Sequence, residues 1–116
     1  MTQEKNKNKF VSLAVLICFV SLFSAGKPIY ASDLIAGEQI FSANCSACHA
    51  GGNNAIIPDK TLKKDALEEN GMNSIAAITT QVKNGKNAMP AFGGRLADED
   101  IDNVANYVLN QSEQGW

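Results

Sequence analysis

Two cysteines and a histidine stand within five residues of one another, as Cys45-Ser46-Ala47-Cys48-His49. This spacing is typical of covalent haem attachment. Two thiols about one helical turn apart can each form a thioether with one vinyl group of a porphyrin. The adjacent imidazole is then brought beneath the iron as an axial ligand. The motif therefore predicts one covalently bound haem c per chain, held by Cys45, Cys48 and His49.

The first 31 residues have the organisation of a secretory signal. Three lysines precede an uncharged apolar run over residues 10–23. Its length suits a signal core of about 7 to 15 residues and falls short of the roughly 20 that a membrane-spanning helix needs. We expect cleavage after the small residue Ala31, which leaves residues 32–116 as one domain and discards Cys18. An uncleaved membrane anchor is the competing interpretation.

Two other chemistries suit a close cysteine pair. A thioredoxin-like redox pair normally lies between a strand and a helix, and no strand pattern is found in residues 32–116. A structural zinc ion usually takes four Cys or His ligands, whereas residues 32–116 contain two cysteines and one histidine. Both interpretations fit the chain less well than haem.

The charge of the predicted mature domain excludes one class of partner. The whole chain carries 10 Lys and Arg against 12 Asp and Glu. The first 31 residues hold four of the basic residues and one of the acidic ones, so residues 32–116 keep six and eleven, a net charge of −5. Nucleic-acid binding requires a basic face. We therefore expect no nucleic-acid partner, and a basic protein patch instead.

Helical spacing of apolar residues dominates the predicted domain. Four helices are expected, over about residues 33–45, 63–69, 74–84 and from Asp98 onward. Asn73 and Asp98 are expected as N-caps, and Gly85 as a C-terminal stop. Gly37, inside the first helix, marks either a close approach of another backbone or a tolerated surface position. The chain is predicted to be all-α, with about four helices around one haem that supplies what a marginal core lacks.

A low-spin electron-transfer haem requires a second axial ligand. Because the chain has one histidine, the candidates are Met72 and Met89. Met89 precedes Pro90, which disfavours helix and lets the methionine project from a loop. Met72 stands at an expected helix entry, where packing is an adequate role. Met89 is therefore the predicted partner of His49 on the iron.

In these motifs the chain resembles the class I c-type cytochromes, and more closely the cytochrome c6 family of oxygenic phototrophs. The resemblance covers nearly all of residues 32–116. It rests on residues 37–41, 45–54, 81–92, 107–109 and 115–116. It implies a small helical fold in which the first and last helices cross, with Gly37 and Phe41 meeting the region of Tyr107. It also implies that Gln81 lies near the haem and Arg95 at a docking surface, although ordinary helix and loop roles suit both.

The same resemblance implies a function. It is that of a soluble, monomeric one-electron carrier that takes an electron from cytochrome f of the cytochrome b6f complex and passes it to photosystem I. The location implied is the thylakoid lumen, cyanobacterial or plastid, reached by the secretory signal. Such a chain is no enzyme and makes no stable membrane insertion. The alternatives are a haem enzyme or ligand sensor with an open iron site, and a cytochrome subunit of a larger complex.

Overall fold

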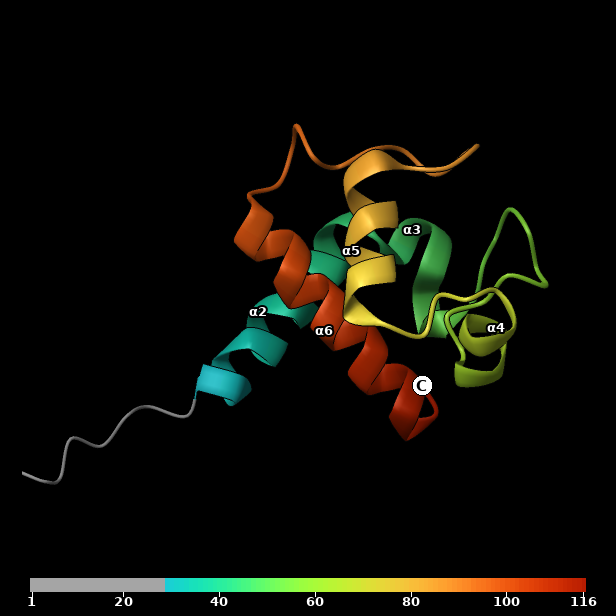
Figure 1. Cartoon of the computed structure of the whole chain (residues 1–116), viewed down its shortest axis with the longest axis horizontal. Helices are drawn as coiled ribbons and strands as arrows, with labels where there is room; N and C mark the ends of the chain where they lie inside the picture. The colour runs from blue at the N-terminus through green and yellow to red at the C-terminus, as the bar shows by residue number, and fades with distance from the viewer. Residues whose placement is uncertain (1–28) are drawn as a thin grey trace, which may run out of the picture.

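The computed structural model describes residues 29–116 as a set of helices (Figure 1). In chain order these are α2 (Ile29–Asn44), α3 (Ser46–His49), the 3-10 helix η1 (Ala50–Gly52), α4 (Lys64–Glu69), α5 (Ile75–Asn84) and α6 (Asp98–Gln114). Within residues 29–116 the strand-like pairing is limited to an isolated bridge between Lys86 and Met89. The predicted all-α fold is confirmed. Most of the predicted leader, with Cys18, lies outside the described residues.

The four predicted helices correspond to α2, α4, α5 and α6. Helix α2 begins at Ile29, ahead of the expected start near residue 33, and so includes Ala31. The haem motif forms a further helical turn, α3, which the pattern did not predict. In residues 29–116 no helix has both the length and the apolar character that crossing a bilayer requires.

Helices α2 and α6 cross, and Gly37 lies at the contact (Figure 1). A methyl group added to Gly37 would lie 2.7 Å from Tyr107 Cβ and would overlap the backbone oxygen of Asn103. The ring of Phe41 lies 5.4 Å from that of Tyr107 and 5.2 Å from that of Trp116. Of the two interpretations of Gly37, the close approach of another backbone is therefore the correct one.

Helix α6 supplies most of the core. Its apolar stripe, predicted from helical spacing over Ile101, Val104, Ala105, Val108 and Leu109, is buried except at Leu109, which is half-buried. The stripe packs against Phe41 of α2 and Phe92 of the loop after α5. It also packs against Ile78 and Val82 of α5. Because these side chains belong to four segments, one buried cluster sets the positions of α2, α5 and the loop after α5.

The N-cap predicted for α5 is wrong by one residue. The capping residue is Ser74 rather than Asn73, and Ser74 Oγ accepts a hydrogen bond from the Ala77 N–H at 3.1 Å. Asparagine and serine favour N-caps about equally, so adjacent candidates could not be separated by residue type. Gly85, with φ of 69°, ends α5 as predicted.

The start of α6 also differs from the expectation that Asp98 is its cap. Ala97 is the capping residue, and its N–H donates to Asp100 Oδ2 at 3.3 Å. Asp98 is the first helical residue and pairs instead with Lys83, at 2.7 Å from Oδ1 to Nζ. The acidic first turn still complements the helix dipole.

Candidate cofactor site

A cavity of about 550 Å³ lies among the five α-helices of residues 29–116 and the loops that follow η1 and α5. Its wall is mainly apolar and includes Phe41, Leu67, Ile78, Val82, Phe92 and Val104. Cavities that bind cofactors usually have volumes of about 300 to 1,000 Å³ and apolar walls with a few polar groups. The size and lining of this cavity therefore suit a large apolar ligand.

Cys45 and Cys48 both line the cavity. Cys45 stands at the N-terminal end of α3 and Cys48 within it, and neither sulfur is joined in a disulfide bond. Burial raises the pKa of the Cys45 thiol to about 11, so this thiol stays protonated at neutral pH. The two predicted attachment points thus lie about one helical turn apart on one wall of the cavity.

His49 lies at the end of α3 and also lines the cavity. Its Nδ1 is 2.9 Å from the backbone oxygen of Asn53. Because a carbonyl oxygen can only accept, Nδ1 carries a proton, and in the neutral imidazole the free lone pair is then on Nε2. A histidine that ligates a metal typically donates its other N–H in this way, which fixes the ring and raises its basicity.

Met89 lines the same cavity from the tight turn after α5. The turn is closed by two backbone hydrogen bonds between Lys86 and Met89, at 3.0 and 2.9 Å. A side chain at Gly85 would lie 2.6 Å from the Met89 oxygen, so glycine is needed there. The side-chain amide of Gln81 donates to Met89 Sδ at 3.6 Å. Met89 therefore projects from a loop, as predicted, and its sulfur is held by a neighbour from α5.

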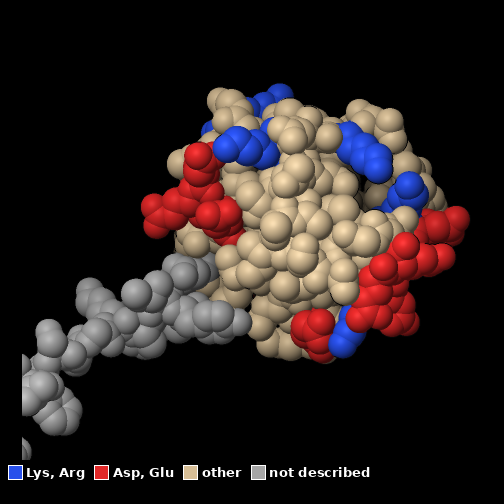
Figure 2. All heavy atoms as spheres, in the orientation of Figure 1, with Lys and Arg blue, Asp and Glu red and all other residues tan. Residues whose placement is uncertain are grey.

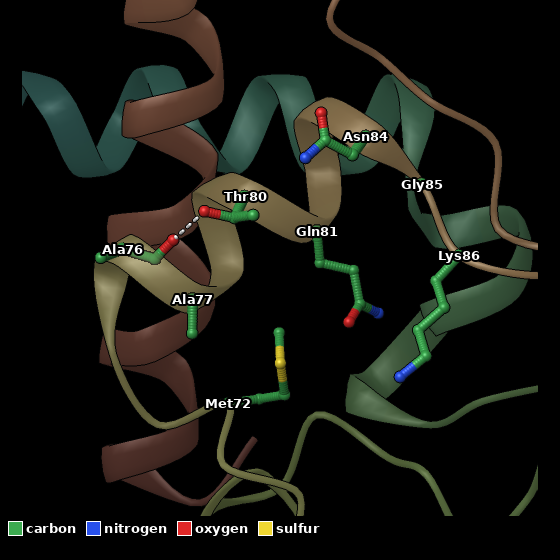
Figure 3. Close-up of a pocket in the computed structure, with 8 residues that line it drawn as sticks. All are labelled: Met72, Ala76, Ala77, Thr80, Gln81, Asn84, Gly85 and Lys86. Atoms are coloured by element: carbon green, nitrogen blue, oxygen red, sulfur yellow. Dashed lines mark hydrogen bonds between the residues drawn. The ribbon is translucent and has the colours of Figure 1, made fainter.

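Met72 lies on the cavity wall as well. It also lines a neighbouring open groove of about 510 Å³ along α5, together with Gln81 and Lys86. Figure 3 shows the side chains of Met72 and Gln81 pointing into this groove. Met72 and Met89 both pack against the core cluster.

The part of the chain that lines the cavity is similar to known proteins. Residues 32–108 match the family model described as "Cytochrome C oxidase, cbb3-type, subunit III". Cytochrome c6 of Gracilaria tenuistipitata var. liui is 85% identical over 87 residues, which are 75% of this chain and 81% of that relative. The chain belongs to the cytochrome c6 family.

Two further members of the cytochrome c6 family show how far the likeness extends. Cytochrome c6 of Pyropia tenera is 76% identical over 85 residues, which are 73% of this chain and 100% of that relative. The solved structure of cytochrome c6 from the diatom Phaeodactylum tricornutum is 62% identical with a TM-score of 0.71, and the match covers 72% of this chain and 99% of that one. The cytochrome c6 family consists of electron-transfer proteins rather than enzymes, and its members carry one covalently attached c-type haem.

The residues around the cavity fit this haem. The apolar wall suits the faces of a porphyrin, and the two thiols suit its two vinyl groups. The charged residues that line the cavity in the described part of the chain are Lys60, Lys86 and Arg95, all of them basic. Basic side chains suit the two propionate carboxylates of a haem.

Acidic side chains of this cytochrome c6-family chain gather away from the cavity lining. Figure 2 shows them in separate groups near the start of α6 and around α4. The residues are Asp98, Glu99 and Asp100 in the first group, and Asp65, Glu68 and Glu69 in the second. The surface therefore combines a basic rim at the cavity with acidic flanks.

Several residues of the site were missed from the sequence. Asn53 contributes a backbone oxygen, which every residue type carries, so no side-chain signal could have identified it. Lys60 and Lys86 stand in loops, where a cation is usually a solvated residue. Gln81 was expected near the haem from the resemblance, and its amide contacts Met89 Sδ.

Proposed function

We propose that this chain carries single electrons from cytochrome f of the cytochrome b6f complex to photosystem I. Cys45 and Cys48 would attach the haem, and His49 and Met89 would be its axial ligands. The observation that carries the proposal is that these four side chains line one cavity, with His49 Nε2 left free by the bond from Nδ1 to Asn53. When bound, the haem iron supplies a one-electron couple, whose potential is raised by methionine ligation and burial.

The chain's own residues favour electron transfer over substrate chemistry. With a haem bound, His49 and Met89 would both ligate the iron and would leave no coordination site for a small molecule. Ile78, Val82 and Phe92 are 6 to 7% exposed and keep water from the cavity wall. A dry wall on fixed helices limits the reorganisation that each change of charge requires.

The proposed location is the thylakoid lumen, in a cyanobacterium or a plastid. We propose that residues 1–31 are a secretory signal removed after Ala31, which leaves residues 32–116 as the mature cytochrome domain. Two findings support this boundary. The family match begins at residue 32, and the Pyropia tenera cytochrome c6 aligns over its whole length across 85 residues. N-terminal sequencing of the purified protein should return Ser32, and recovery of Met1 would contradict the proposal.

The proposed docking surface surrounds the mouth of the cavity. Ile56 and Ile57 line the cavity and are 61% and 39% exposed. Beside the cavity, the guanidinium carbon of Arg95 lies 5.7 Å from the centre of the Phe92 ring. A small apolar contact with charged surroundings gives fast exchange at modest affinity. Such a surface suits a monomeric carrier that must release each partner after transfer.

The acidic flanks would attract a basic partner at long range. We expect the electron-transfer rate with a partner that has a basic patch to fall about tenfold when ionic strength rises from about 0.01 to 0.15 M, because the Debye length shortens from roughly 30 to 8 Å. Stopped-flow kinetics measure this rate. Changing Glu68 and Glu69 to Gln should weaken the salt dependence, while Glu38→Gln on α2 serves as the control. A rate that does not respond to salt would remove electrostatic steering from the proposal.

The ligand assignment is tested by an optical redox titration of the holoprotein. A single one-electron wave at clearly positive potential is expected, with low-spin spectra in both states. Met89→Ala should abolish the sulfur-to-iron charge-transfer band of the oxidised protein, and Met72→Ala, on the same cavity wall, should keep it. A band that survives in Met89→Ala would contradict the assignment. Tight carbon monoxide binding by the native reduced protein would instead favour a ligand sensor or haem enzyme.

A further inference from the structure

Trp116 lies beyond the end of α6 and contacts the loop that follows the haem motif. Its backbone N–H donates to the Gln111 oxygen at 3.1 Å, which fixes it to the last turn of α6. Its indole Nε1–H donates to the backbone oxygen of Leu62 at 2.8 Å. Its ring covers Gly52 so closely that a methyl group there would overlap the indole. One side chain thus holds the loop at two points.

These two points are the ends of one closed loop. The Leu62 N–H donates to the Gly52 oxygen at 2.7 Å, so residues 52 and 62 are held together beneath the indole. Gly52 has a φ of 74°, a conformation that suits glycine. A larger residue would be strained there and would also displace the indole. The base of the loop is therefore built around the Trp116 ring.

The residue after Gly52 is Asn53, whose backbone oxygen accepts the hydrogen bond from His49 Nδ1. The position of this oxygen depends on the backbone of residues 50–53. That backbone is fastened on one side by the Asn53 N–H, which donates to the Ala50 oxygen at 3.2 Å. On the other side it is fastened by the contact between Gly52 and Trp116. A continuous set of contacts thus runs from Trp116 through Gly52 and Asn53 to the His49 ring.

We propose that Trp116 is a positioning residue for His49: by clamping Gly52 and Leu62 it holds the Asn53 oxygen that orients and polarises the imidazole. The inference rests on the proposed role of His49 as an axial ligand. A role in core packing alone would use the ring, which lies 5.2 Å from Phe41 and 6.2 Å from Tyr107. Core packing alone would not require the hydrogen bond from the Trp116 indole N–H to the Leu62 oxygen. The test removes this hydrogen bond.

The test uses the reduced, haem-loaded protein and NMR of the His49 Nδ1–H proton. Trp116→Phe keeps an aromatic ring but loses the bond to Leu62. We expect exchange of this proton with solvent to become about fivefold faster, because one hydrogen bond of ordinary strength no longer closes the loop. Trp116→Ala loses the ring as well and should give a larger increase. The reduction potential should move to more positive values in the same order, since a weaker acceptor makes the imidazole a poorer electron donor.

Tyr107→Phe is the matched control. It perturbs the same aromatic cluster, and the Tyr107 hydroxyl bonds to Gln111 of α6 rather than to the loop. Its exchange rate and potential should equal those of the wild type. Unchanged exchange in Trp116→Phe would overturn the proposal, and so would equal acceleration in Trp116→Phe and Tyr107→Phe. These outcomes are decisive even if Trp116→Ala fails to fold. A wild-type protein without a low-spin histidine and methionine spectrum would instead refute the axial-ligand proposal itself.

Discussion

The crossing of α2 and α6 and the wall of the haem cavity are built in different ways from the same chain. At the crossing, Gly37 admits a neighbouring backbone, and the rings of Phe41, Tyr107 and Trp116 lie 5.2 to 6.2 Å apart. On the loop side of the cavity of about 550 Å³, residues 50–62 and 85–95 are held mainly by backbone hydrogen bonds. The first region fills its own core with side chains, whereas the second would take the proposed haem as its core.

This difference predicts which region survives a given perturbation. Without a cofactor, the apolar wall of this cavity of about 550 Å³ would be exposed to water. Exposure of apolar surface is unfavourable by about 25 cal/mol per Å², and the total stability of a small domain is only about 5 to 15 kcal/mol. The cavity wall should therefore depend on the cofactor for its structure, and the crossing should not.

The largest effect is expected when the covalent attachment is removed. Cys45→Ala with Cys48→Ala should yield a chain without thioether-bound haem that no longer unfolds cooperatively, because the cavity loses its filling. Circular dichroism during thermal unfolding and the absorbance of the pyridine haemochrome measure the two losses. Ser46→Ala, between the two cysteines, should attach haem and unfold as the wild type does. Cooperative unfolding of the double variant at the wild-type midpoint would show that the cavity wall is independent of the cofactor.

A change at the crossing should give the opposite pattern, with lower stability and an unaltered haem. Gly37→Ala drives a methyl group into the backbone of Asn103, and overpacking of this kind costs about 2 to 3 kcal/mol. Denaturant unfolding gives the stability, while the reduction potential and visible spectrum should stay as in the wild type. Gly94→Ala is the control, because a methyl group there meets no atom within 4 Å. A shift in potential for Gly37→Ala would break the separation of the two regions.

The smallest effect concerns Tyr107 at the crossing. Burial raises the pKa of Tyr107 above its ordinary value of 10.0, and Glu38 acts in the same direction, whereas a hydrogen bond with Gln111 acts against them. The unfolded state therefore loses this proton first, so stability that is present below pH 10 is lost as pH rises through the higher folded value. Tyr107 is the single tyrosine of residues 32–116, so phenolate absorbance reports it alone. Tyr107→Phe supplies the baseline, and a folded pKa at or below 10 would contradict the burial.

The local parts of the fold could be predicted from the sequence. The stripe on α6 and the stop at Gly85 follow from residue type and spacing, and the structure confirms them. The helical turn α3 was not predicted. The other errors lie at helix ends, where Ser74 rather than Asn73 caps α5 and Ala97 rather than Asp98 precedes α6. Asn73 and Ser74 have similar capping preferences, so residue type could not separate them. Asp98 is a better N-cap than Ala97 by residue type, but it lies in the first turn and pairs with Lys83.

The residues of the candidate site also differ in how far they could be predicted from the sequence. The haem motif was visible because Cys45, Cys48 and His49 are neighbours in sequence, and the loop position of Met89 followed from Pro90. The acceptor for His49 is a backbone oxygen without a side-chain signature. The contact of Trp116 with Leu62 joins residues 54 positions apart, which no local spacing could indicate. Sequence patterns thus predict a set of ligands, but they do not indicate the long-range contacts around His49.

The separation in sequence between the haem motif and Trp116 also sets an order of events. If the proposed signal directs export with the N-terminus first, Cys45 and Cys48 reach the new compartment before Trp116. The loop over residues 52–62 would then have no indole at its base until the C-terminus arrives, because Trp116 lies 54 positions after Leu62.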